Sequence, residues 1–171
     1  MIFSSLDLSP ELQQALDACG YSEMTAIQEQ AIIPARRGKD LLASAQTGTG
    51  KTAAFALPIL QQMHNNPKPT LPGNPRALIL TPTRELAAQV HDSFKLYARD
   101  LKFDSACIFG GVGMNPQVQA LAKGVDVLVA CPGRLLDLAN QRAIVLSLVG
   151  IPVPHEAHPT LHMVVTQYAK E

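Results

Sequence analysis

One stretch of eight residues constrains the fold of this chain more than any other. It ends in a lysine followed by a threonine, and its members are Ala45, Gln46, Thr47, Gly48, Thr49, Gly50, Lys51 and Thr52. This is the pattern of a phosphate-binding loop, with alanine where the first glycine usually stands. Gly48 and Gly50 permit a tight turn whose backbone N–H groups can point at phosphate oxygens. We expect all eight residues to bind a nucleotide, with Lys51 at the β- and γ-phosphates and the Thr52 hydroxyl on Mg²⁺.

The residues on either side of this loop have the composition that the motif requires. Residues 40–44 have the pattern of a short buried strand, and residues 53–63 are apolar at helical spacing. A helix that begins at the loop directs its positive N-terminal end toward the phosphates. The alternative is a Gly/Thr-rich turn that binds nothing, and the order of strand, loop and helix argues against it.

Length and composition set the class of protein. The 171 residues suffice for one domain with a substantial core, and 47% hydrophobic with 16% charged residues is typical of a globular protein. The formal net charge is zero. Any contact with nucleic acid must therefore come from a local patch rather than from a global basic field.

The cysteines and the N-terminus indicate the compartment. Cys19, Cys107 and Cys131 are odd in number and irregularly spaced, which favours reduced thiols. The N-terminus has neither the basic region nor the apolar region of a signal peptide, and no apolar run approaches membrane-spanning length. We expect a cytoplasmic protein that does not contact a membrane.

Strand and helix patterns alternate along the chain. Besides residues 40–44, the predicted strands are 77–81, 105–109 and 126–130. The predicted helices span residues 26–37, 53–63, 83–98 and 115–122, and two further helices begin at Ser9 and at Pro132. This alternation predicts an α/β fold with a parallel sheet covered by helices on both faces. Because ligands bind at the carboxyl ends of such strands, the loops that follow the strands should share one face.

These stretches, in this order, resemble the DEAD-box ATP-dependent RNA helicases, and in particular their bacterial RhlE-like branch. The resemblance covers residues 3 to about 143 nearly continuously. It implies the N-terminal RecA-like domain of a P-loop NTPase, with ATP and Mg²⁺ as cofactors and RNA as partner. In the family, ATP binding and hydrolysis are coupled to the local opening of RNA duplexes.

Gly20-Tyr21 followed by Thr25-Ala-Ile-Gln28 is similar to the adenine-reading Q motif of this family, with Ala26 where proline is usual. The resemblance implies that Tyr21 stacks on adenine and that Gln28 hydrogen-bonds to its edge. A side-chain amide can pair with N6 and N7 of adenine at once, which distinguishes ATP from GTP. Without the flanking match, Gln28 would be interpreted as a solvated helix residue.

Three further motifs are similar to those that bind the RNA sugar-phosphate backbone in the family. Their residues are Pro82, Thr83, Arg84, Gly110, Gly111, Pro132, Gly133 and Arg134. Arginines offer charge-assisted hydrogen bonds to phosphate, and glycines offer backbone N–H groups, so such a surface grips RNA of any sequence. The alternative for each arginine is a surface ion pair. Cys131 stands where the family usually has threonine, and a thiol is a poor donor.

The sequence departs from the family after about residue 143. In register, residues 149–163 overlay the buried strand that ends in Asp-Glu-Ala-Asp, with His155 and Glu156 at its first two positions. Every mismatch is one base change away, so either mutation or an error in the sequence would produce this pattern. Glu156 would orient the attacking water and, with Lys51, would be catalytic. His155 replaces the carboxylate that holds Mg²⁺, and an imidazole suits that ion poorly.

Prolines are the second departure in this region. Pro152 and Pro154 would each remove an N–H from an interior strand, so we expect the chain from about Val145 to be irregular. The Ser-Ala-Thr motif and the second RecA-like domain of the family have no counterpart in the sequence.

We interpret residues 1–38 as N-terminal helices with the Q motif, residues 39–143 as the RecA-like core, and residues 144–171 as a degenerate continuation. The sequence is compatible with two functions: the ATP-binding half of an RNA helicase, or a non-catalytic remnant that binds adenine nucleotide weakly and unwinds nothing.

Overall fold

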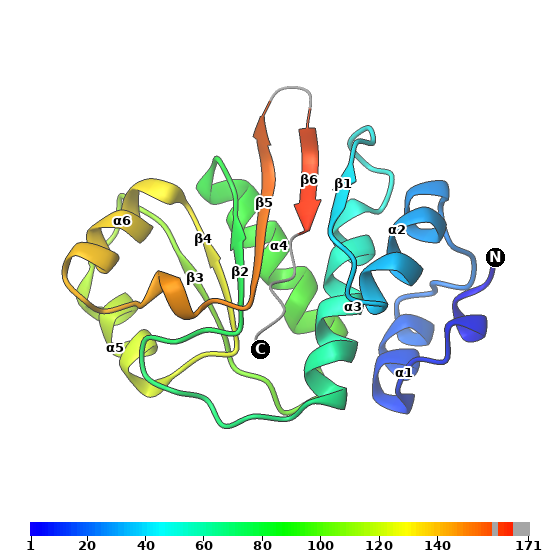
Figure 1. The fold of residues 1–171 in the computed structure, drawn as a ribbon, viewed down its shortest axis with the longest axis horizontal. Helices are drawn as coiled ribbons and strands as arrows, with labels where there is room; N and C mark the ends of the chain where they lie inside the picture. Colours follow the sequence, from blue (N-terminus) through cyan, green and yellow to red (C-terminus); the bar gives the residue numbers. More distant parts are fainter. Residues whose placement is uncertain (159–160, 166–171) are drawn as a thin grey trace.

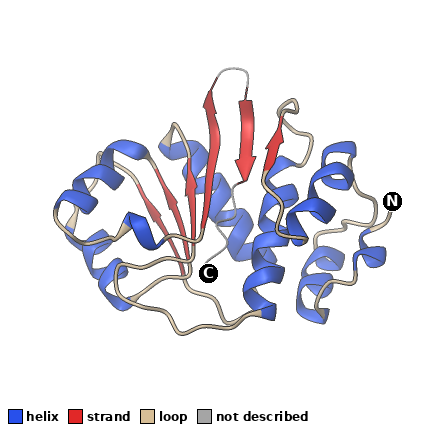
Figure 2. Cartoon of the chain, in the orientation of Figure 1, coloured by secondary structure: helices blue, strands red, loops and turns tan. Residues whose placement is uncertain are grey.

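Helices and strands alternate along the chain as predicted (Figures 1 and 2). The computed structural model describes the backbone of residues 1–158 and 161–165 and the side chains of residues 1–155. The described helices are η1 (Phe3–Leu6), α1 (Pro10–Ala18), α2 (Ala26–Arg36), α3 (Lys51–Asn65), α4 (Arg84–Tyr97), α5 (Asn115–Lys123), α6 (Pro132–Asn140) and η2 (Leu146–Leu148). The described strands are β1 (Leu41–Ala43), β2 (Ala77–Leu80), β3 (Ser105–Ile108), β4 (Val127–Ala130), β5 (Ile151–His158) and β6 (Leu161–Val165).

The described strands form one sheet in the order β1-β6-β5-β2-β4-β3. The ladders β3–β4, β4–β2 and β2–β5 are parallel, and Ile79 of β2 lies opposite Val129 on one side and Val153 on the other. The predicted parallel sheet is therefore confirmed for these four strands. Strand β6 was not predicted, and it runs antiparallel to both β1 and β5.

Two hydrophobic clusters cover the two faces of the sheet. Ile79, Val129 and Val153 face the larger cluster, which contains the buried side chains of α1 to α4. Leu78 and Leu128, one residue along on the same strands, face the smaller cluster with residues of α5 and α6. The continuous apolar runs in the sequence follow from this burial on both faces. In Figure 1, α1 to α3 gather near one edge of the sheet and α5 and α6 near the other.

Local capping signals in the sequence position two of the helices. The Ser9 hydroxyl accepts a hydrogen bond from the Leu12 N–H (3.4 Å) at the start of α1, and Thr83 accepts one from the Leu86 N–H (3.2 Å) at the start of α4. Each bond satisfies one of the backbone donors that a helix start leaves without an internal partner. Within the described residues, no helix combines the length and the apolar character that crossing a membrane requires.

The expectation of an irregular chain from about Val145 is wrong for the described residues. A short 3-10 helix, η2, is followed by β5, which pairs with β2 from Ile151 to Pro154. Both prolines lie within this ladder, opposite Leu78 and Leu80. The prediction assumed that the N–H of every residue in this strand is needed for a hydrogen bond to a neighbouring strand.

The direction in which the proline nitrogens point explains the difference. The Ile151 N–H donates to the Arg76 carbonyl (3.0 Å), so the odd-numbered N–H groups of β5 face β2. Since successive N–H groups alternate between the two sides of a strand, the nitrogens of Pro152 and Pro154 point away from β2. The pairs described between β5 and β6 are at His155 and His158, beyond both prolines. Neither proline therefore removes a hydrogen bond from the parallel ladder.

Candidate nucleotide and RNA site

The phosphate-binding loop connects β1 to α3. Gly48 and Gly50 have φ angles of 81° and 84°, in the left-handed region that glycine adopts without strain. The Thr49 hydroxyl donates to the Gln46 carbonyl (2.6 Å), which tightens the turn. The two glycines of the sequence motif are thus the residues at which the backbone of this loop takes the left-handed conformation.

Two polar residues begin α3 directly after the loop. Lys51 is buried, with 6% of its surface exposed, and Thr52 is half-buried. Both stand in the first turn of a 15-residue helix, where the helix dipole favours negative charge. An ammonium group, a hydroxyl and a helix N-terminus thus follow one another at the end of the loop, which is the combination that binds phosphate.

The Q-motif residues hold the phosphate-binding loop from the side of α2. The Thr25 hydroxyl donates to the Thr49 carbonyl (2.7 Å), and the Gln28 amide Nε2 donates to the Gly50 carbonyl (3.2 Å). The other end of the same amide, Oε1, accepts from the Thr25 N–H (2.9 Å). Gln28 is 4% exposed, so it is a buried brace and not a solvated helix glutamine. The sequence motif pointed to Gln28 but gave no sign that Thr25 would bond to the loop.

A cavity of about 520 Å³ lies between the start of α2 and the phosphate-binding loop. Its lining residues are Thr25, Ala26, Ile27, Gln30, Ser44, Ala45, Gly48 and Thr49. Tyr21 is not among them. Its ring packs between Phe3, at 6.2 Å between ring centroids, and Tyr97, at 6.3 Å, and 39% of Tyr21 is exposed. Burial and the hydrogen bond with Tyr21 raise the pKa of Tyr97 above its ordinary value.

The position that the family fills with a metal-holding carboxylate is buried in this chain. His155 is 2% exposed, and its ring lies 5.1 Å from the ring of Phe55 on α3, tilted by 60°. Within the described residues, no group of three or more His, Cys, Asp or Glu side chains is placed to hold a metal ion. An imidazole packed on a phenyl ring does not fit a hard Mg²⁺ ion. The side chain of Glu156, predicted to be catalytic, lies outside the described residues.

The predicted RNA-binding loops do come together at the carboxyl ends of the strands. The Arg84 side chain is 55% exposed, and its guanidinium lies 6.0 Å over the Phe109 ring. A Cβ atom added to Gly111 would lie 3.0 Å from Nη1 of Arg84, which shows how closely the two loops approach. Arg84 Nε also lies 3.5 Å from Glu85, an exposed pair that contributes little to stability. Arg84 therefore offers an outward-facing cation beside the glycine turn.

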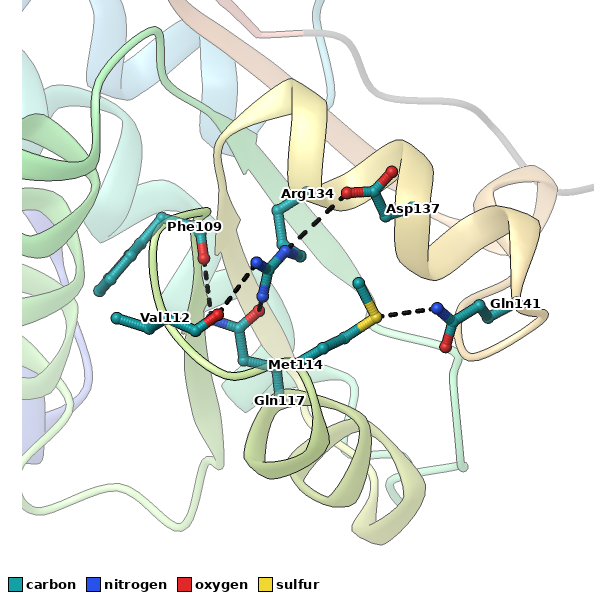
Figure 3. A network of polar contacts seen from close by, with 7 residues as sticks. All are labelled: Phe109, Val112, Met114, Gln117, Arg134, Asp137 and Gln141. Atoms are coloured by element: carbon teal, nitrogen blue, oxygen red, sulfur yellow. Dashed lines mark hydrogen bonds and ion pairs between the residues drawn. The ribbon is translucent and has the colours of Figure 1, made fainter.

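Arg134 lies at the same turn, as predicted, but it points inward (Figure 3). Its side chain is 11% exposed, and its Nη2 donates to the Val112 carbonyl (3.0 Å). Its Nη1 donates to Oε1 of Gln117 (3.1 Å), and its Nε lies 3.9 Å from Asp137. Sequence reasoning did not find Gln117, because a glutamine on an amphipathic helix such as α5 carries no local signal of a contact with another element.

The remaining predicted RNA-binding residues are exposed, and they are Pro82, Thr83, Gly110, Gly111, Pro132 and Gly133. Beneath them, the ends of β2 and β4 approach each other. The Thr81 hydroxyl lies 3.9 Å from the Cys131 sulfur and donates to the Thr83 carbonyl (3.3 Å).

Burial, followed by the proximity of Cys131, raises the pKa of Cys107 to about 11, so this thiol is protonated at neutral pH.

Comparison with known proteins places this geometry in a family. The sequence profile of the DEAD/DEAH box helicases matches residues 25–171. The ATP-dependent RNA helicase SrmB of Haemophilus influenzae is 44% identical over 161 residues, covering 94% of this chain and 36% of that protein. The ATP-dependent RNA helicase RhlB of Xanthomonas oryzae is 43% identical over 145 residues, covering 84% of this chain and 25% of that protein.

A solved structure agrees with the sequence matches. The crystal structure of a hypothetical ATP-dependent RNA helicase from Sulfolobus tokodaii superposes with a TM-score of 0.78 at 33% identity, covering 88% of this chain and 42% of that chain. The chain thus spans between a quarter and two-fifths of the length of these relatives. Membership of the RhlE-like branch stays a prediction. The chain itself belongs to the DEAD/DEAH box helicase family.

Proposed function

We propose that this chain is the nucleotide-binding and RNA-binding unit of an ATP-dependent RNA helicase. The observation that supports this most directly is the arrangement at the carboxyl ends of the sheet. There the Q motif braces the phosphate-binding loop, and Arg84 stands over the glycine turn that follows β3. The names of the matched relatives, which are ATP-dependent RNA helicases, support the same activity.

For the nucleotide, each proposed contact has a physical basis. The N–H groups of residues 45–50 would bind phosphate oxygens, Lys51 would place a positive charge on the β- and γ-phosphates, and Thr52 would contact Mg²⁺ bound to the phosphates. The exposed part of the Tyr21 ring would stack on adenine. Gln28 retains one amide hydrogen and one lone pair beyond its two hydrogen bonds to the protein, which suffices to pair with the edge of adenine.

For RNA, we propose contacts to the sugar-phosphate backbone. The exposed guanidinium of Arg84 and the exposed backbone of Gly110, Gly111 and Gly133 offer donors to phosphate oxygens. Such donors carry no information about base sequence, so binding should be independent of the RNA sequence and should weaken as the salt concentration rises.

A second candidate function is specifically favoured by His155. Because a buried imidazole stands in place of the Mg²⁺-holding carboxylate, we propose nucleotide and RNA binding without RNA-stimulated hydrolysis. Thr52 and the phosphates would then hold Mg²⁺ without that carboxylate. Losses of this kind act on one transition state and typically reduce rates by several orders of magnitude.

Binding and turnover of adenine nucleotide test these two candidates. We expect labelled ADP to bind the parent chain and to bind Lys51→Ala at least tenfold more weakly, because the substitution removes a point charge from the phosphates. Equal binding by the two proteins would contradict the nucleotide site. RNA-dependent phosphate release by the parent chain clearly above that of Lys51→Ala would overturn the second candidate and leave the helicase enzyme as the function.

A further inference from the structure

Side chains of two neighbouring helices hold the turn that follows β3 at both of its ends (Figure 3). At the first end, Nε2 of Gln117 on α5 donates to the Phe109 carbonyl (3.0 Å). At the second end, Nη2 of Arg134 on α6 donates to the Val112 carbonyl (3.0 Å). The two side chains are themselves joined, because Nη1 of Arg134 donates to Oε1 of Gln117 (3.1 Å). We call this closed set of bonds the Gln117–Arg134 clamp.

The turn has little else to fix its shape. Gly111 takes a φ of 78°, and among the residues that the structure describes no backbone carbonyl accepts a hydrogen bond from the N–H groups of residues 110–113. The bonds of the clamp to the Phe109 and Val112 carbonyls therefore hold this exposed turn at both of its ends. A turn of fixed shape whose N–H groups are not used by the backbone of the protein is a suitable partner for an anion.

The two arginines near this turn differ in their exposure and in their contacts. Arg134 is 11% exposed, and its Nη1 and Nη2 donate to Gln117 and to the Val112 carbonyl within the clamp. Its Nε lies 3.9 Å from Asp137. Arg84, at 55% exposed, is the arginine that faces outward over the turn. A phosphate that approaches the turn would therefore meet the charge of Arg84 first.

We propose that Gln117 is a positioning residue for RNA binding. Through the Gln117–Arg134 clamp it holds the Gly110–Gly111 turn in the shape that accepts a backbone phosphate, while Arg84 supplies the positive charge. This inference rests on the proposed RNA-binding function, since it assigns a role within that same surface.

Glutamine is suited to this role because it donates at one end and accepts at the other. Methionine has nearly the same length and volume but neither hydrogen-bonding group, so Gln117→Met removes the bonds and keeps the packing. Glutamate would still accept from Arg134 but would place a negative charge beside the Phe109 carbonyl. Gln119, exposed on the same helix, provides the matched control Gln119→Met.

The experiment measures the affinity of the full chain for a single-stranded oligouridine at several salt concentrations. We expect Gln117→Met to weaken RNA binding about fivefold to tenfold, as the loss of two hydrogen bonds allows, without changing the salt dependence or the affinity for ADP. We expect Arg84→Gln to reduce the slope of log K against log salt by about one, because one phosphate contact is lost. Gln119→Met should behave like the parent chain.

Two outcomes would overturn the proposal. One is RNA affinity in Gln117→Met equal to that in Gln119→Met. The other is a slope reduced by about one in Arg134→Met but unchanged in Arg84→Gln, which would make Arg134 the phosphate ligand. If the parent chain binds no RNA, the proposed function fails, and amide hydrogen exchange of residues 110–113 still decides whether the Gln117–Arg134 clamp holds the turn. Exchange there must be faster in Gln117→Met than in Gln119→Met, and equal exchange would reject the clamp.

Discussion

Gly50 is the residue at which the Q motif contacts the phosphate-binding loop. Its carbonyl accepts the Gln28 amide, and its φ of 84° lies in the left-handed region. A Cβ atom added there would lie 2.3 Å from Nε2 of Gln28, whereas one added to Gly48 would have nothing within 4 Å. The two glycines therefore share the same backbone requirement and differ only in the space around them.

This difference gives a prediction for the unliganded chain. Gly48→Ala should cost about 1–2 kcal/mol in free energy of unfolding, which is the left-handed strain alone. Gly50→Ala should cost more, by roughly 1–3 kcal/mol, because the new methyl group displaces a buried amide from its hydrogen bonds. Urea unfolding of both variants against the parent chain measures the two costs. Equal costs would show that Gln28 does not brace the loop.

What the sequence could and could not predict at this scale follows from the range of the interactions. The left-handed glycines of the loop were predictable, because the turn itself demands them. The inward orientation of Arg134 was not, because its partners Val112 and Gln117 lie 22 and 17 residues away. Only the packing of α5 against α6 and the turn brings those groups within hydrogen-bonding distance.

At the scale of single elements, β5 shows that the side of a strand on which a proline nitrogen lies decides its effect. The odd-numbered N–H groups face β2, and the nitrogens of Pro152 and Pro154 face away. We expect Val153→Pro to destabilise the chain by roughly 1–3 kcal/mol beyond Val153→Ala, which also shortens the side chain but keeps the N–H. Pro154→Ala should change stability by less than about 1 kcal/mol.

Thermal or urea unfolding of the three variants tests this assignment of sides. A similar cost for Val153→Pro and Val153→Ala would mean that β5 does not pair with β2 in the described register. A large loss of stability in Pro154→Ala would mean that the prolines contribute to the sheet in a way that the backbone geometry does not explain.

Helix α4 and strand β3 are joined by a contact that should depend on pH. Nε2 of His91 lies 2.9 Å from the Ser105 hydroxyl. Burial, followed by the charge of Lys95, lowers the pKa of His91 below its ordinary value of 6.5, against the opposing influence of Asp92 and Ser105. The unfolded chain therefore binds a proton at this site before the folded chain does, as the pH falls.

It follows that this histidine reduces stability as the pH is lowered through its ordinary value. Between about pH 7.5 and about pH 5.5, the free energy of unfolding should fall more steeply in the parent chain than in His91→Gln, which keeps a hydrogen-bonding side chain without the titration. Urea unfolding across this range measures both slopes. A steeper fall in His91→Gln would reverse the assigned direction of the pKa shift.

At the scale of the whole molecule, the alternation of apolar runs and amphipathic helices was enough to predict a parallel sheet covered on both faces. Strand β6 could not be predicted in this way. Its first residues lie at the end of the stretch that overlays the Asp-Glu-Ala-Asp element of the family. Its place in the sheet comes from pairing with both β1 and β5, which are far apart from each other in the chain. Sequence periodicity specifies which face of a strand is buried but not which neighbours it joins.

At position 155, the resemblance to the family and the packing of this chain lead to opposite expectations. If only the imidazole prevents turnover, His155→Asp should restore it. The packing predicts otherwise, because position 155 is 2% exposed and lies against Phe55. A carboxylate there would be a charge withdrawn from water, and withdrawing a charge from water costs free energy.

We expect His155→Asp to be less stable than His155→Asn, which has the same size without the charge, by about 1–3 kcal/mol at neutral pH. The difference should shrink as the pH falls and the carboxyl group binds a proton, because burial disfavours its charged form. RNA-dependent phosphate release should stay at the level of Lys51→Ala in both variants. Equal stability of the two variants, together with Mg²⁺-dependent tightening of ADP binding in His155→Asp alone, would show that this position still faces the nucleotide.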